Sequence, residues 1–140
     1  MDRVLEEHAK LGAELPSAAV HDLRISLRRC ILIADVMRDL DQGADWKPMR
    51  KSAKRIFKQL GALRDSQVLM EWIEKLRVLG DASADLLVQS LKDRSEKDLV
   101  SAKDAIRKFD RKQWRAWTGK LASFLMAGLV VAICYDVPLR

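Results

Sequence analysis

Apolar residues recur at helical spacing along most of the chain, and the clearest run lies between residues 17 and 39. On a helix that turns about 100° per residue, residues three, four and seven positions apart share one face. We expect this helix to begin at Ser17, a residue type that caps helices, and to turn one stripe into the core. That stripe consists of Val20, Leu23, Leu27, Ile31 and Ala34.

The same spacing predicts four more helical segments, over residues 2–12, from Trp46 to the turn at Gly80 and Asp81, and over residues 84–109 and 111–125. Gly61 lies inside the second of these, where it predicts a kink or a brief break. His8, in the first segment, has charged neighbours in sequence, so we expect it on the surface. Few Val, Ile, Thr or Tyr residues alternate with polar ones, so the pattern does not support strands. The predicted fold class is therefore all-α.

Composition restricts the classes of function. At 140 residues the chain is one domain or part of a larger one. Its net charge of +6 favours an anionic partner, which can be nucleic acid, anionic lipid or a polyphosphorylated molecule. Cys30 and Cys134 lack the spacing of metal ligands, and the amino terminus lacks the apolar core of a signal peptide. We therefore expect reduced thiols, no bound metal or cofactor, and a cytoplasmic location.

A first row of basic side chains runs along the 17–39 helix beside its apolar stripe. His21, Arg24 and Arg28 are spaced i, i+3 and i+7, and Arg29 adds a further charge. Such a row is often a solvated flank whose long stems cover the edge of the core. The alternative is an anion site, because arginine binds phosphate through a planar fork of donors and stays charged. The row runs between the core stripe and a second apolar strip, formed by Ile25, Leu32 and Val36.

The helix that follows carries a second basic row. No acidic residue occurs between Asp45 and Asp65, so nothing in this helix neutralises the row. A lysine face can serve solubility alone, but interleaved glutamates stabilise such a face better. At the next junction Arg64 can reach the same anion, and Asp65 can orient a neighbouring guanidinium. The row itself consists of Lys47, Lys51, Lys54 and Lys58.

These two segments resemble the CHAD family, the conserved histidine alpha-helical domain. VHDLRISLRRCILIADVM resembles the family's signature of a histidine followed by arginines at +3, +7 and +8, here His21, Arg24, Arg28 and Arg29. LGALRDSQVL resembles its leucine, glycine and Arg-Asp junction, here Leu60, Gly61, Arg64 and Asp65. Lys54 and Lys58 match basic positions on the preceding helix. Gln67 departs from the family's pattern, which commonly has a second aspartate at that position.

The resemblance implies an all-α protein built from antiparallel four-helix bundles. Because the chain has about half the family's length, we expect the first bundle over residues 1–125 and an extra apolar helical tail over residues 126–140. The resemblance also implies non-catalytic binding of inorganic polyphosphate, or another polyanion, in a basic groove, and an association with polyphosphate granules. Together with the two rows, it indicates as binding residues His21, Arg24, Arg28, Arg29, Lys51, Lys54, Lys58 and Arg64, with Asp65 orienting them.

Two other functions remain open at this point. The run His21-Asp22-Leu23-Arg24 also resembles the histidine box of sensor kinases and phosphotransfer bundles, with His21 as the phospho-acceptor. Trp114 and Trp117 alternate with basic residues, as in proteins that stack single-stranded nucleic acid. Core packing is the more common role of tryptophan on a helix, so nucleic acid is the less favoured partner.

The run from Leu121 to Tyr135 contains 15 residues without charge. It is shorter than the roughly 20 residues that span a bilayer, so we do not expect a membrane span. A buried or partner-facing helix is favoured instead. Such a helix would allow a homodimer that restores the missing bundle.

Overall fold

The computed structural model describes residues 2–12, 14–42, 45–76 and 82–134, with side chains up to residue 127. These ranges contain no strand, and the predicted all-α bundle is confirmed. The described helices are α1 (Asp2–Lys10), α2 (Ser17–Leu40), α3 (Lys47–Leu76), α4 (Ala82–Arg107) and α5 (Arg111–Cys134).

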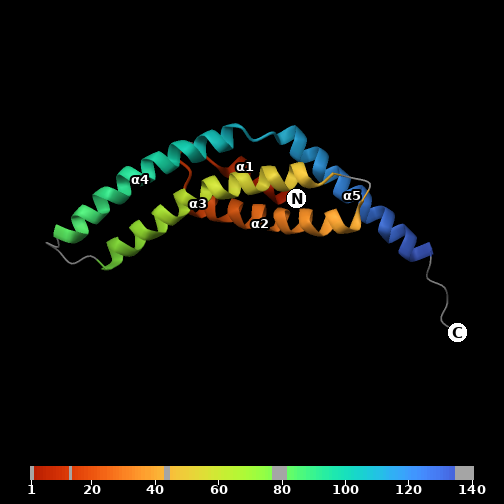
Figure 1. The fold of residues 1–140 in the computed structure, drawn as a ribbon, viewed down its shortest axis with the longest axis horizontal. Helices are drawn as coiled ribbons and strands as arrows, with labels where there is room; N and C mark the ends of the chain where they lie inside the picture. Colours follow the sequence, from red (N-terminus) through yellow and green to blue (C-terminus); the bar gives the residue numbers. More distant parts are fainter. Residues whose placement is uncertain (1, 13, 43–44, 77–81, 135–140) are drawn as a thin grey trace.

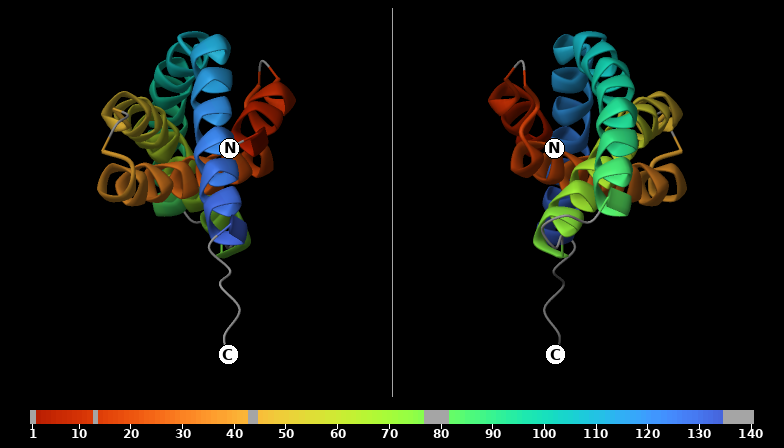
Figure 2. Two further views of the ribbon diagram at one scale, coloured as in Figure 1. Left: turned by 90° about the vertical axis from the view of Figure 1, so that its right-hand side faces the viewer. Right: turned by 90° about the vertical axis from the view of Figure 1, so that its left-hand side faces the viewer.

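The helices form an elongated arc around the α2–α3 pair (Figure 1). α2 and α3 lie side by side and antiparallel, and α4 turns back along the half of α3 that extends beyond α2. α5 begins where α4 ends and contacts α1, which in turn packs on α2. In both end-on views α1 and α4 lie on either side of α5 (Figure 2). α3 therefore lies between α2 and α4 and leaves one face open.

The predicted α2 stripe forms the centre of the core. Val20, Leu23, Leu27 and Ala34 are buried, and Ile31 is partly buried against them. Trp114 and Trp117 are also buried and pack edge to face, with ring centroids 5.3 Å apart. The core-packing alternative for these tryptophans is confirmed, so neither ring is free to stack on a base. Burial of aromatic surface of this size is a major contribution to stability. α3 supplies the facing core residues Met49, Ala53, Ile56, Leu60 and Leu63.

His8 does not lie free on the surface, so that expectation was wrong. Its ring stacks on Phe109 with centroids 4.1 Å apart, and its Nε2 lies 3.3 Å from the carbonyl oxygen of Ile106. Burial lowers the pKa of His8, and the nearby Arg111 charge lowers it further, while the bond to Ile106 raises it. The residues that bury the ring are far from His8 in sequence, so its charged neighbours misled the prediction.

α3 is continuous through Gly61, so the brief break is wrong and the kink stays a prediction. A Cβ at Gly61 would lie 2.7 Å from Nη1 of Arg24, which reaches across from α2. A glycine inside a helix costs about 1 kcal/mol relative to alanine, and here the missing side chain makes room for a guanidinium. The glycine therefore marks a close approach between two helices.

Ser17 is the first residue of α2, and the residue before it, Pro16, takes the cap position without a side-chain cap bond. The predicted cap role of Ser17 was wrong, because its hydroxyl group is engaged elsewhere: it donates to Glu71 at 2.9 Å and accepts from Arg64. Gln67 donates from Nε2 to the carbonyl oxygen of Leu15 at 3.2 Å. Leu15 has a φ of 46°, an uncommon value for leucine. Residues of α3 thus hold the turn that leads into α2.

α5 runs without interruption from Arg111 to Cys134, and it crosses the proposed domain division at residue 125. That division stays a prediction. None of the described helices combines the length and the hydropathy that crossing a bilayer requires. Cys30 is a buried free thiol, and burial raises its pKa to about 11, while the side chain of Cys134 lies outside the described residues.

Candidate functional site

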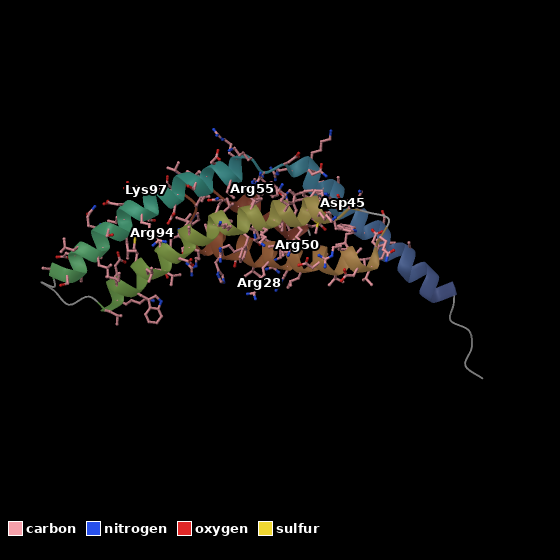
Figure 3. All side chains as sticks on the ribbon, viewed as in Figure 1. Arg28, Asp45, Arg50, Arg55, Arg94 and Lys97 are labelled. Atoms are coloured by element: carbon pink, nitrogen blue, oxygen red, sulfur yellow. The ribbon has the colours of Figure 1, made fainter. Side chains whose placement is uncertain are left out.

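Three polar contacts fix how α2 lies against α3. Arg64 of α3 donates to Ser17, Arg24 of α2 donates to the carbonyl oxygen of Phe57 at 2.8 Å, and Arg50 donates to Asp35 at 2.6 Å. As the residue number rises along α2, the residue number of the contact partner on α3 falls, as an antiparallel helix pair requires. Arg28 lies between the second and third contacts, which places it opposite the segment of α3 around Lys54. Figure 3 shows Arg28 on α2 and Arg50 on the adjacent side of α3.

Arg24 is anchored on α3 by two contacts with Phe57. Its guanidinium carbon lies 4.3 Å from the centroid of the Phe57 ring, in addition to the bond to the Phe57 carbonyl. Partial burial lowers the pKa of Arg24, and the nearby charge of Arg64 also lowers it, whereas the charge of Asp65 raises it. The guanidinium of Arg24 is therefore held against α3 at the turn that contains Phe57.

A groove of about 510 Å³ runs along the open face of the first half of α3, and we call it the α3 groove. Seven of its eight lining residues are cationic, and all but one of the eight belong to α3 or directly precede it. Arg38 provides the wall on the α2 side. The lining residues are Arg38, Trp46, Lys47, Arg50, Lys51, Lys54, Arg55 and Lys58.

Most cations of the α3 groove have no acidic partner among the residues that the structure describes. Asp35 forms ion pairs with Arg50 at 2.6 Å and with Arg38 at 3.8 Å. Arg38 also forms an ion pair with Asp39 at 3.3 Å. In the described part of the chain the other five cations of the groove form no ion pair. Like charges this close repel each other, so the α3 groove concentrates positive charge that the described side chains do not neutralise.

The structure brings some of the predicted site residues together and separates others. Lys51, Lys54 and Lys58 line the α3 groove. His21, Arg28 and Arg29 are exposed on α2 and do not line it, and Arg29 is turned about a further 100° beyond Arg28. Arg64 is partly buried, bonded to Ser17 and 3.5 Å from Glu71, and it does not line the α3 groove.

Sequence reasoning did not include four cations of the α3 groove in the site. Lys47, Arg50 and Arg55 lie on the acid-free segment before Asp65, so their charge was visible in the sequence. Arg38 gave no such signal, because it sits among aspartates on α2 and reaches the groove through packing.

Asp65 is exposed and forms no ion pair within the residues described here. Its carboxylate acts on Arg24 through charge alone. The described side chains also contain no group of three His, Cys, Asp or Glu residues that is able to hold a metal ion. The chemistry of this surface is therefore that of exposed guanidinium and ammonium groups.

Fold and surface together define the class of protein: an all-α bundle that presents a row of cations along the open face of one helix. The model of the CHAD domain family matches residues 2–132. The chain therefore belongs to the CHAD domain family, as the two sequence motifs indicated. Neither the curated proteins nor the solved structures contain a significant match to the chain.

Proposed function

We propose that the α3 groove binds inorganic polyphosphate without catalysing a reaction. The observation that carries this proposal is the row of five cations in the groove that lack an acidic partner in the described residues. Polyphosphate is a linear chain with a negative charge on each phosphate, and a line of cations matches that geometry. Membership of the CHAD family, which is associated with polyphosphate binding, supports the same ligand.

The spacing of the cations favours an extended anion over a compact one. Lys47 and Lys58 are eleven positions apart on a straight helix, which corresponds to about 16 Å. A single phosphate group contacts at most a few neighbouring cations of such a row. A chain of phosphates contacts many of them and releases a counterion at each contact, as nucleic acid backbones do. Arg24 and Arg28 carry further positive charge on the neighbouring helix α2.

The test is calorimetric titration of long-chain polyphosphate into the protein at several salt concentrations. We expect the logarithm of the affinity to fall linearly with the logarithm of salt concentration, with a slope of about 0.7 for each phosphate contact. A slope near zero, or no binding at 0.1 M salt, would rule out the proposal. Competition by single-stranded DNA at the same salt concentration measures how selective the groove is for phosphate chains.

A second candidate is phosphotransfer at His21, which is exposed as a phospho-acceptor must be. Arg24 and Arg28 flank it and suit the phosphoryl group. Incubation with acetyl phosphate, followed by detection of acid-labile phosphohistidine, distinguishes this function from binding. His21→Gln removes the label in that case, and it leaves most of the polyphosphate affinity intact.

A further inference from the structure

A second hollow lies directly beside the α3 groove, on the α4 side of α3. Its volume is about 230 Å³, and we call it the α4 crossing. Arg55 lines both the α3 groove and the α4 crossing, so the two are contiguous. Figure 3 shows Arg55 on the side of α3 that faces α4. The α4 crossing is lined by Arg55, Gln59, Ser101, Asp104, Ala105 and Lys108.

We propose that the α4 crossing is a second binding stretch for the same phosphate chain, entered over Arg55 and used by long chains only. This inference rests on the proposed function, because it takes polyphosphate as the ligand of the α3 groove. A chain that fills the α3 groove continues past Arg55 and reaches Lys108 at the end of α4. Gln59 and Ser101 offer neutral donors along the way.

Asp104 is the carboxylate that a phosphate group has to replace there. Its Oδ2 accepts from Lys108 at 2.6 Å, and its Oδ1 accepts from Arg107 at 2.9 Å. The hydrogen bond from Lys108, followed by the one from Arg107, lowers the pKa of Asp104, so the carboxylate is ionised at neutral pH. Ion pairs between exposed side chains contribute little to stability, so a phosphate can take over either cation at small cost.

The path does not end at Lys108. A third hollow of about 380 Å³ is lined by Val100, Lys103, Asp104 and Arg107, and it shares Asp104 with the α4 crossing. Displacing the carboxylate of Asp104 therefore frees cations on both sides of it. A short chain already finds enough partners in the α3 groove, so only a long chain gains from this continuation.

The experiment compares tripolyphosphate with long-chain polyphosphate on four proteins: wild type, Lys108→Ala, Asp104→Asn and the charge-matched control Lys92→Ala. Lys92 is exposed on α4 and lines none of the three hollows. Thermal unfolding of each variant checks that the fold is intact. Each phosphate contact contributes about 0.7 to the slope of the logarithm of affinity against the logarithm of salt concentration. With 1 M salt as the reference concentration, loss of one contact therefore weakens the affinity about fivefold at 0.1 M salt.

We expect Lys108→Ala to bind long chains about fivefold more weakly than wild type and tripolyphosphate equally well. Asp104→Asn is expected to bind long chains more tightly, since it removes the competing carboxylate. The inference is overturned if Lys108→Ala keeps the wild-type affinity for long chains, if it loses both ligands equally, or if Lys92→Ala loses as much. Absence of long-chain binding by the wild type overturns the proposed function itself, which separates the two failures.

Discussion

The two flanks of α2 are built from opposite chemistry. On the flank toward α3, Ser17, Arg24 and Asp35 make directional polar contacts, and the neighbouring charges stay open to solvent. On the flank toward α5, a groove of about 360 Å³ is lined entirely by apolar residues. We call it the apolar groove, and it consists of Leu32, Ile33, Val36, Met37, Leu40, Leu121, Phe124 and Leu125.

The two flanks differ in the kind of surface that each leaves exposed to solvent. The flank toward α3 fixes the register of the helix pair by hydrogen bonds and leaves positive charge without an acidic partner. The flank toward α5 leaves apolar surface in contact with water: Leu32 is 58% exposed and Val36 is 55% exposed. Exposed charge attracts an anion, whereas a contiguous exposed apolar surface is typical of a contact with another protein surface. One helix therefore separates a charged surface from an apolar one.

Removing charge from the α3 groove is expected to have the largest effect. Lys54→Ala/Lys58→Ala removes two phosphate contacts, which corresponds to about 25-fold weaker binding of long-chain polyphosphate at 0.1 M salt. The unfolding free energy should change by less than about 0.5 kcal/mol, because both side chains are exposed. Titration and urea denaturation measure the two quantities. The control Lys92→Ala/Lys120→Ala carries the same change in net charge, and an equal loss of affinity by this control would contradict a localised site.

The apolar groove is expected to govern self-association without affecting polyphosphate. The homodimer through residues 121–135 stays a prediction, and Tyr135 lies outside the described residues. Val36→Asp/Leu125→Asp places two charges in the groove, and burying an unpaired charge is strongly unfavourable. We expect the dissociation constant of the dimer to rise at least tenfold in light scattering. Leu86→Asp, exposed on α4 outside the groove, is the control. A wild-type chain that stays monomeric at every concentration contradicts the prediction.

A smaller effect is expected where Arg24 crosses to α3. Gly61→Ala places a Cβ at 2.7 Å from Nη1 of Arg24, so the guanidinium must leave the carbonyl oxygen of Phe57. A hydrogen bond to a charged group contributes about 1.5–3 kcal/mol, and alanine recovers about 1 kcal/mol of helix propensity. The net destabilisation should be about 1 kcal/mol by chemical denaturation. In an Arg24→Met background the same change should instead stabilise, and a stabilised Gly61→Ala single variant would refute this account.

The smallest effect is expected from His8, which lines neither the α3 groove nor the apolar groove. Burial lowers the pKa of His8 in the folded state below its ordinary value of 6.5. The unfolded state therefore binds the proton more tightly, and stability is lost as the pH falls below about 6.5 toward the folded pKa. His8→Phe should reduce this loss between pH 7.5 and 5.5, measured by urea denaturation at each pH. Identical pH profiles of variant and wild type would exclude His8 as the titrating group.

The helices were predictable because their signals are local. The stripe from Val20 to Ala34 and the acid-free run between Asp45 and Asp65 are read from neighbouring residues alone. Three predictions failed, namely a break at Gly61, a cap at Ser17 and a solvated His8, and each failure has the same cause. Their partners are Arg24, the pair Arg64 and Glu71, and Phe109, which lie far away in sequence.

The amino-acid sequence by itself determined that this chain is helical, that it belongs to the CHAD family, and that two of its helices carry basic rows, the second of them on a stretch without acidic residues. Helical periodicity and charge spacing are properties of short segments, so they can be read from the sequence without knowledge of the packing. The tertiary structure decided that Arg24 is anchored on α3, that Arg38 closes one wall of the α3 groove, and that Arg55 connects this groove to the end of α4. These contacts depend on which faces of the helices pack together. The fit of side chains from distant parts of the chain decides this packing.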